Sequence, residues 1–258
     1  MTYTIAVAGK GGTGKTTFTG LLINSLLKEK EPLLAVDADP SMNLNEVLGI
    51  SVESSIADIR ESALKNDPNF DSMPKDRLVE YLLHRTLIET EYFDLLAMGR
   101  PEGKRCYCFV NNLLRRHLDA LSNQYKYVVI DNEAGMEHLS RMTTRDVDLL
   151  IILSDPSHRG LLTAKRIHDL VAELNIPVKR ELLVINKLRK ENCAQTTNNA
   201  IELGFSSILM LPHDETAISF DEDGIPLVDL PETTPLKIAI EDFAKQLLKN
   251  KTEKVIAT

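Results

Sequence analysis

The stretch TIAVAGKGGTGKTT, residues 4–17, decides the fold of this chain. Its first part, Thr4–Ala8, is a short apolar run, and the glycine cluster Gly9–Gly14 follows directly. From Thr16 to Lys30, apolar residues recur at the spacing of one helical face. The stretch therefore predicts a strand, a glycine-rich loop and a helix, in that order.

The glycine-rich loop, residues 9–16, fits the pattern G-x-x-x-x-G-K-[ST] at the strand-to-helix junction where that pattern acts. Glycines let backbone N–H groups surround phosphate oxygens, and the N-terminus of the following helix favours the same anion. We predict that Lys15 bridges the β- and γ-phosphates of a nucleotide and that the Thr16 hydroxyl binds Mg²⁺. The alternative is a glycine-rich turn that holds no ligand.

The rest of the chain alternates apolar strands with helical segments. We predict strands at Leu33–Asp37, Phe93–Met98, Tyr127–Asp131, Leu149–Ser154, Glu181–Asn186 and Ile208–Leu211. We predict helices at Ser55–Leu64, Arg77–Ile88, Asn111–Leu121, Thr163–Leu174, Ala194–Leu203 and Leu236–Lys249. Near-continuous apolar strands indicate an α/β fold with a doubly wound, mainly parallel sheet and helices on both faces. No repeat or linker divides the chain, so residues 1–258 form one domain, with 251–258 as a flexible tail.

The composition excludes several classes of protein. Hydrophobic residues make up 43% of the 258 residues and charged residues 26%, which is typical of a folded globular chain and not of disordered or collagen-like ones. A formal net charge of −8 argues against nucleic acid as a partner. The sequence has no long apolar run and no basic, apolar leader, so we expect a cytoplasmic protein without a membrane partner.

Lys10 distinguishes this loop from an ordinary phosphate loop. KGGTGKTT, residues 10–17, resembles the signature K-G-G-x-G-K-[ST]-T of the deviant Walker A ATPases, the family of MinD, ParA and the nitrogenase iron protein. The resemblance implies a homodimer around ATP, in which Lys10 reaches the nucleotide of the partner as an arginine finger does. A solvated loop lysine is the alternative. The loop residues that the resemblance assigns to the nucleotide are Gly11, Gly12, Thr13, Gly14, Lys15, Thr16 and Thr17.

Three later strand ends resemble other parts of the same family's site. Val36–Pro40 resembles its first switch, which implies that Asp39 orients or deprotonates the attacking water and that Asp37 lies near Mg²⁺. Tyr127–Asp131 resembles its Walker B strand, which implies that Asp131 holds Mg²⁺ through water. Asn186 and Lys187 resemble its base-reading segment, with Asn186 bonded to adenine. Helix capping by the aspartates and an ordinary turn at Asn186 remain the alternatives.

Cys106 and Cys108 lie in a charged loop, one residue apart. In extended backbone both thiols point to one side, and Lys104 and Arg105 beside them favour thiolates. Two thiolates are half of a tetrahedral site, and a two-fold dimer supplies the other half, so we predict Zn²⁺ or Ni²⁺ at the dimer interface. Two core cysteines are the alternative. Cys193 has no local ligand pattern and is interpreted as structural.

This cysteine pair and the segment Asp131–Arg141 together resemble the CooC type of accessory ATPase. The resemblance implies ATP/ADP and Mg²⁺ as cofactors and a nickel-enzyme client, either carbon monoxide dehydrogenase or acetyl-CoA synthase. His138 is either a metal ligand or a hydrogen-bonding switch residue. Two alternative functions stay open: an iron–sulfur electron-transfer ATPase of the nitrogenase-iron-protein type, and a MinD-like positioning ATPase.

Overall fold

The structure is a computed structural model that describes residues 2–59, 61, 74, 77, 85–100, 121–132 and 147–256, with the backbone alone at 122 and 250–256. Its strands are β1 (Tyr3–Gly9), β2 (Leu33–Ala38), β3 (Leu87–Glu89), β4 (Asp94–Ala97), β5 (Tyr127–Asn132), β6 (Leu149–Ser154), β7 (Glu181–Leu188) and β8 (Ile208–Pro212). Within the described residues they form one eight-stranded sheet in the order β3-β4-β2-β5-β1-β6-β7-β8. Neighbouring strands run parallel, except that β3 is antiparallel to β4.

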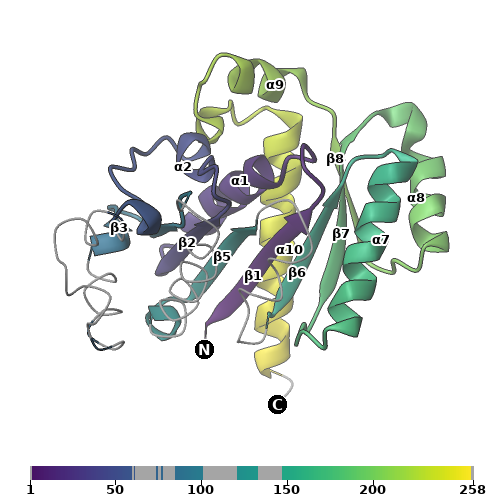
Figure 1. Cartoon of the computed structure of the whole chain (residues 1–258). Helices are drawn as coiled ribbons and strands as arrows, with labels where there is room; N and C mark the ends of the chain where they lie inside the picture. Colours follow the sequence, from purple (N-terminus) through teal and green to yellow (C-terminus); the bar gives the residue numbers. More distant parts are fainter. Residues whose placement is uncertain are drawn as a thin grey trace.

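Helices cover both faces of this sheet. They are α1 (Lys15–Leu27), α2 (Leu44–Val47), α7 (His158–Glu173), α8 (Cys193–Glu202), α9 (Glu215–Glu222) and α10 (Pro235–Ile256), with short 3-10 turns η2 (Ser122–Gln124), η3 (Lys190–Asn192) and η4 (Leu227–Asp229). Figure 1 shows α7 and α8 on one side of the strands and α1 and α10 on the other. The fold has three layers, helix, sheet and helix.

Alternation along β1 explains the three layers. Ile5 and Val7 belong to a core cluster with residues of α1 and α10, whereas Ala6 and Ala8 belong to a second cluster with residues of α7 and α8. Successive side chains of a strand point to opposite faces, so a strand that is apolar at every position is buried from both sides. Every residue of β2, β5 and β6 is buried for the same reason.

The predicted fold class, a doubly wound and mainly parallel sheet with helices on both faces, is confirmed. The predicted helix Arg77–Ile88 is wrong at its end, because Leu87 and Ile88 belong to β3. They pair with Leu96 and Leu95 of β4, and this strand pairing overrides the helical spacing of the sequence. Most of the residues before them lie outside the described part of the chain.

Two helices extend beyond their predicted ends. α7 begins at His158 rather than Thr163, because the Ser157 hydroxyl caps it by accepting a hydrogen bond from the Gly160 N–H. α10 continues past Lys249 to Ile256, so the predicted tail is helical up to residue 256. No glycine or proline interrupts residues 236–256. None of the helices in the described part of the chain is long and apolar enough to cross a membrane.

Candidate functional site

The loop between β1 and α1 requires glycine at two positions. Gly9 and Gly14 have φ angles of 153° and 88°, which residues with a side chain rarely adopt. A Cβ on Gly9 would lie 2.3 Å from the carbonyl oxygen of Leu153, and one on Gly14 would lie 2.6 Å from the Nδ2 atom of Asn186. The glycines therefore let the loop lie directly against β6 and β7.

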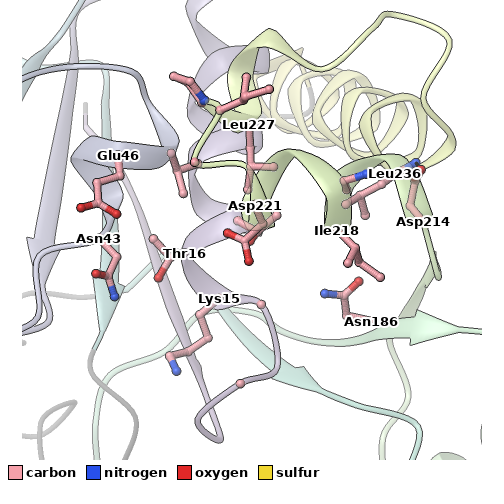
Figure 2. Close-up of a pocket in the computed structure, with 18 of the residues that line it drawn as sticks. Lys15, Thr16, Asn43, Glu46, Asn186, Asp214, Ile218, Asp221, Leu227 and Leu236 are labelled. Atoms are coloured by element: carbon pink, nitrogen blue, oxygen red, sulfur yellow. Dashed lines mark hydrogen bonds between the residues drawn. The ribbon is translucent and has the colours of Figure 1, made fainter.

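Positive charge gathers at the base of this loop. Lys15, the first residue of α1, is 8% exposed, and its Nζ lies 3.4 Å from the carbonyl oxygen of Lys10. The Thr13 hydroxyl donates to the same oxygen over 2.8 Å, which closes the loop. The N-terminus of α1 adds its partial positive charge to that of the Lys15 ammonium (Figure 2). The arrangement suits an anion such as a phosphate group.

The carboxyl end of β7 holds the loop from the side. Asn186 is 5% exposed, and its Nδ2 donates to the carbonyl oxygen of Thr13 over 2.9 Å. Its Oδ1 accepts the backbone N–H of Lys187 over 2.8 Å. Lys187, at φ 58°, places its Nζ 2.9 Å from the carbonyl oxygen of Gly12. These contacts fix which way the Asn186 amide faces, and they join β7 to the phosphate loop.

Two buried carboxylates lie opposite each other at the ends of β2 and β5, where Asp37 and Asp131 are register partners. Burial raises the pKa of Asp37 to about 6, against hydrogen bonds from the N–H groups of Leu44 and Asp39 that lower it. Burial also raises the pKa of Asp131 to about 7, against a hydrogen bond to Thr16 that lowers it. Neither negative charge is fully compensated by the protein alone.

Asp39 lies just beyond these two carboxylates, at the edge of the cavity. Its N–H donates to Oδ1 of Asp37 over 3.0 Å, and its own Oδ1 accepts the N–H of Ser41 over 2.8 Å. The N–H of Leu44 donates to Oδ2 of Asp37 over 3.0 Å. The segment from Asp39 to Leu44 is therefore anchored through Asp37.

The side chain of Lys10, the distinctive residue of the signature, lies beside Asp155. Its Nζ lies 3.9 Å from Oδ2 of Asp155, which follows β6, and its side chain is 45% exposed. The Asp155 carboxylate also accepts the N–H of Ser157, at the N-terminus of α7. Lys10 therefore makes a loose, solvent-screened ion pair within its own chain.

The phosphate loop, Asp39 and the end of β7 line a cavity of about 1010 Å³. This volume is at the upper end of the range for small-molecule binding sites. Figure 2 shows Lys15, Thr16, Asn43 and Asn186 around it, with side chains of α9 and of the loop before α10 across from them. The residues along its walls include Gly11, Gly12, Gly14, Lys15, Thr16, Thr17, Asp39, Asn186, Lys187, His213, Ile218, Asp221, Pro226 and Leu227. Most of the predicted nucleotide ligands thus meet in one cavity at the carboxyl edge of the sheet.

The family model of the CobQ/CobB/MinD/ParA nucleotide binding domain matches residues 4–227. The chain belongs to this family. The match begins in β1 and includes the phosphate loop, both carboxylate-bearing strand ends and the Asn186–Lys187 segment. The predicted membership in a family with MinD and ParA is therefore confirmed.

Relatives in this family share nearly the whole length of the chain. An uncharacterized ATP-binding protein of Methanocaldococcus jannaschii is 47% identical over 96% of this chain and 99% of its own. The carbon monoxide dehydrogenase accessory protein CooC of Rhodospirillum rubrum is 30% identical over 88% of this chain and 89% of its own. The septum site-determining protein MinD of Thermotoga maritima is 24% identical over 94% and 86%.

Solved structures of the family share the fold. A ParA family ATPase of Chlorobium tepidum has a TM-score of 0.73 at 21% identity, covering 95% of this chain and 99% of its own. MinD of Pyrococcus horikoshii, solved in complex with Mg-ADP, has a TM-score of 0.70 at 20% identity over 96% of both chains. At these identities the likeness shows the three-layer fold and not a shared activity.

Several predicted residues fall outside the described part of the chain. Cys106, Cys108 and His138 are among them, so their predicted roles are untested. Elsewhere, the described residues hold no group of three or more His, Cys, Asp or Glu that could bind a metal ion. Cys193 begins α8, half-buried, with its Sγ 3.7 Å from the carbonyl oxygen of Arg189.

Two further residues at or beside the site carry no motif in the sequence. The buried Thr19 hydroxyl donates to the Lys15 carbonyl oxygen over 2.8 Å and lies 3.4 Å from Oδ1 of Asp131. Asp214 caps α9 through the N–H groups of Thr216 and Ala217, and its Oδ2 accepts the N–H of Leu236 in α10. An aspartate before a helical segment is a known start signal and could have revealed α9.

Proposed function

We propose that this protein is an Mg²⁺-dependent ATPase, and the orientation of Asn186 carries the proposal. An asparagine amide has two N–H donors and an oxygen that accepts twice. The contacts to Thr13 and Lys187 use one donor and one acceptor position, which leaves one of each. That remaining pair matches the N7 and N6 groups of adenine and not the two acceptors of guanine.

Competition between ATP and GTP tests this selectivity. We expect the protein to bind ATP at least about tenfold more tightly, and Asn186→Ala to lose that preference, since a good bidentate pair is worth ~1–3 kcal/mol of discrimination. Equal affinity for the two nucleotides in the parent would contradict the adenine assignment.

For Mg²⁺, the fitting donors are the Thr16 hydroxyl and the buried Asp131 carboxylate, since Mg²⁺ prefers oxygen ligands. The two side chains are hydrogen-bonded to each other, and Asp131 carries a charge that burial disfavours. The ion supplies charge neutralisation at the phosphates when bound. Lys15 binds the phosphates, and Asp39 orients the attacking water and accepts its proton. Lys15→Ala should abolish tight ATP binding, whereas Asp39→Asn should keep binding and lose hydrolysis.

We further propose that two copies of the chain close around ATP, with Lys10 reaching the partner's nucleotide. The exposed position of Lys10 and its loose pair with Asp155 leave it available to a second chain. Lys10→Ala should bind nucleotide normally but neither dimerise on ATP nor hydrolyse it. Size-exclusion chromatography with ATP and a phosphate-release assay give the two readouts, and parent-level hydrolysis would sink the trans-acting lysine.

The client proposed for this ATPase is a nickel enzyme, carbon monoxide dehydrogenase or acetyl-CoA synthase. Support comes from the Cys106–Cys108 pair of the sequence and from the likeness to CooC. Four thiolates of a dimer would then bind one Zn²⁺ or Ni²⁺ ion, and slow hydrolysis would switch the site between two states.

Metal content per chain tests this part of the proposal. We expect one ion per two chains in the parent and in Cys193→Ala, and loss of the ion in Cys106→Ala and Cys108→Ala. One ion per single chain would contradict the shared site, and an iron–sulfur absorption band would favour the electron-transfer alternative. Pull-down of a nickel enzyme from native cells, with and without ATP, tests the client.

A MinD-like positioning role is the second candidate, favoured by the likeness to MinD of Thermotoga maritima over 94% of this chain. Such a role requires ATP-dependent membrane attachment. Sedimentation with anionic liposomes separates the two: ATP-dependent co-sedimentation supports positioning, and its absence supports the nickel-enzyme role.

A further inference from the structure

One wall of the nucleotide cavity is a segment to which no sequence motif points. We call residues 224–232 the η4 arm, because the 3-10 turn η4 lies at its centre. Gly224, Ile225, Pro226 and Leu227 line the cavity. In Figure 2, Leu227 lies across the cavity from Lys15 and Asn186. The position of the η4 arm therefore sets the width of the site.

The backbone of the η4 arm bonds mainly to itself and to α9. The N–H of Ile225 donates to Phe220 in α9, that of Asp229 to Pro226, and that of Leu230 to Leu227. Two apolar side chains, Leu227 and Leu230, anchor the arm in the core beside α1. None of these backbone hydrogen bonds joins the arm to the sheet, so side-chain contacts also help to place it.

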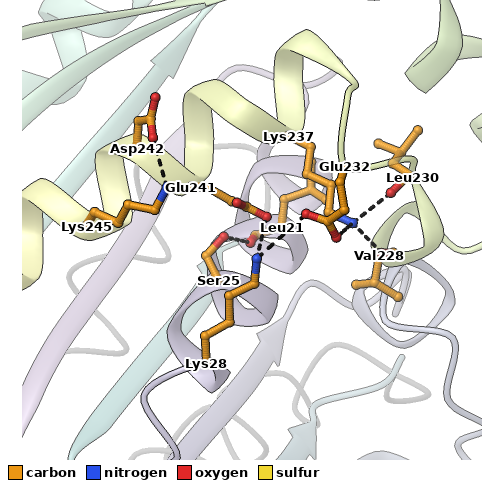
Figure 3. Close-up of polar contacts among 10 residues, drawn as sticks. All are labelled: Leu21, Ser25, Lys28, Val228, Leu230, Glu232, Lys237, Glu241, Asp242 and Lys245. Atoms are coloured by element: carbon orange, nitrogen blue, oxygen red, sulfur yellow. Dashed lines mark hydrogen bonds and ion pairs between the residues drawn. The ribbon is translucent and has the colours of Figure 1, made fainter.

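Lys237, in the first turn of α10, supplies the main polar contact to the η4 arm. Its Nζ lies 2.7 Å from the carbonyl oxygen of Leu230, 3.3 Å from that of Val228 and 2.9 Å from Oε1 of Glu232 (Figure 3). The side chain of Lys237 is only 6% exposed. An ammonium has three donors, and here all three have an acceptor on the arm.

The η4 arm also lies beside two helices near the proposed nucleotide-binding residues. These are α1, which begins at the phosphate loop, and α2, which follows Asp39. Glu232 lies 3.8 Å from Lys28 at the end of α1, and Lys28 binds Glu241 of α10 at 2.7 Å (Figure 3). On the other side, a Cβ on Gly49, just after α2, would lie 3.2 Å from Pro226. The arm thus packs between the helix of the phosphate loop and the helix that follows Asp39.

We propose that Lys237 is a positioning residue for nucleotide binding: by bonding the carbonyl groups of Val228 and Leu230, it holds the η4 arm against the cavity. This inference rests on the proposed ATPase function. Without the ammonium, two carbonyl groups beside the core lose their donor, and the arm gains freedom that binding must remove. Because the arm lines the cavity and holds none of the proposed catalytic residues, we expect the loss to fall on nucleotide binding and not on the chemical step.

The test compares Lys237→Met with Lys245→Met in the full-length protein. Lys245 lies on the same helix, but it pairs with Asp242 on the surface, at 3.1 Å. We expect Lys237→Met to raise the dissociation constant of Mg-ADP, measured by calorimetry, about tenfold, as the loss of a buried hydrogen bond predicts. The KM for ATP should rise similarly with kcat within about twofold, and Lys245→Met should match the parent.

The melting temperature without nucleotide separates positioning from stability. If Lys237→Met melts earlier but keeps the parent's dissociation constant and KM below its melting point, the positioning role is overturned. Lys237→Gln, whose amide still reaches one carbonyl group, is the milder variant for the case that Lys237→Met does not fold. It should weaken Mg-ADP binding by about threefold, and unchanged binding would overturn the proposal. A parent that binds no Mg-ADP would instead refute the proposed ATPase function.

Discussion

The ends of β2 and β5 carry the same residue type at the same register and at the same depth, yet their surroundings differ. Asp37 and Asp131 are both 1% exposed. Both oxygens of Asp37 accept backbone N–H groups, from Asp39 and Leu44. Asp131 instead contacts hydroxyl groups of α1, among them that of Thr19.

This difference separates two roles that the sequence assigned together. A carboxylate whose two oxygens each accept a backbone N–H group fixes the course of the chain, as Asp37 does for residues 39–44. Among the described residues, Asp131 meets hydroxyl groups of the phosphate-loop helix, and a carboxylate bonded in this way keeps lone pairs for a hydrated cation. The comparison therefore predicts that Asp131 serves Mg²⁺ and that Asp37 serves the loop.

Asp131→Asn should have the largest effect on activity. Without the carboxylate the hydrated Mg²⁺ loses its anionic partner, and hydrolysis should fall roughly 100-fold or more. A phosphate-release assay at saturating Mg-ATP measures the loss. ADP binding in EDTA should stay near the parent's value, since it involves no metal. A variant that keeps half of the activity would remove Asp131 from the metal site.

Asp37→Asn should have a smaller effect of a different kind. The amide oxygen replaces one acceptor, but the amide nitrogen faces a backbone N–H, so residues 39–44 should loosen. We expect about tenfold slower hydrolysis, because Asp39 is then less well placed. Hydrogen exchange should quicken at Ser41–Leu44 and stay unchanged in Asp94→Asn, a carboxylate change on β4. If hydrogen exchange at Ser41–Leu44 is as slow in Asp37→Asn as in Asp94→Asn, Asp37 does not anchor this segment.

The pH dependence of stability in the metal-free protein provides a further test of the two buried aspartates. An aspartate whose pKa is raised on folding, from 3.8 to about 6 for Asp37 and about 7 for Asp131, binds more protons folded than unfolded. Its contribution to stability is therefore complete below pH 3.8 and is lost as the pH rises through the folded pKa.

The melting temperature of Asp131→Asn should accordingly rise relative to that of the parent as the pH increases from 4 to 7. Each kcal/mol of difference in stability corresponds to roughly 2–4 °C for a chain of this size. The difference is measured by scanning calorimetry without divalent cations. A gap between variant and parent that does not change with pH would contradict the raised pKa of Asp131.

Thr19→Val should give the smallest effect. The substitution removes a hydroxyl group that lies 3.4 Å from Oδ1 of Asp131 and keeps the size of the side chain. We expect about threefold slower hydrolysis and a loss of stability of ~1 kcal/mol. Ser25→Ala is the matched control, since its hydroxyl donates to Leu21 in the same helix over 2.8 Å without meeting a carboxylate. If the rate of hydrolysis falls equally in the two variants, Thr19 has no specific role in the reaction.

Residues 4–17 were enough to predict the strand, loop and helix at the centre of the site, because glycine positions and apolar spacing leave a clear pattern. The four-residue α2 and the eight-residue α9 escaped prediction, since so few turns show little periodicity. The contact of Lys237 with the η4 arm could not be predicted either. Its acceptors at Val228 and Leu230 are backbone carbonyl groups, which every residue carries.

The strand order has a consequence for how the molecule opens. β1 carries the phosphate loop at its end and is hydrogen-bonded on both sides, to β5 and β6, whereas β3 and β8 lie at the margins of the described sheet. Fraying begins where a strand has one neighbour and reaches the interior last. The phosphate loop is therefore attached to the part of the sheet that unfolds last. Local opening of the marginal strands can occur without displacing the loop.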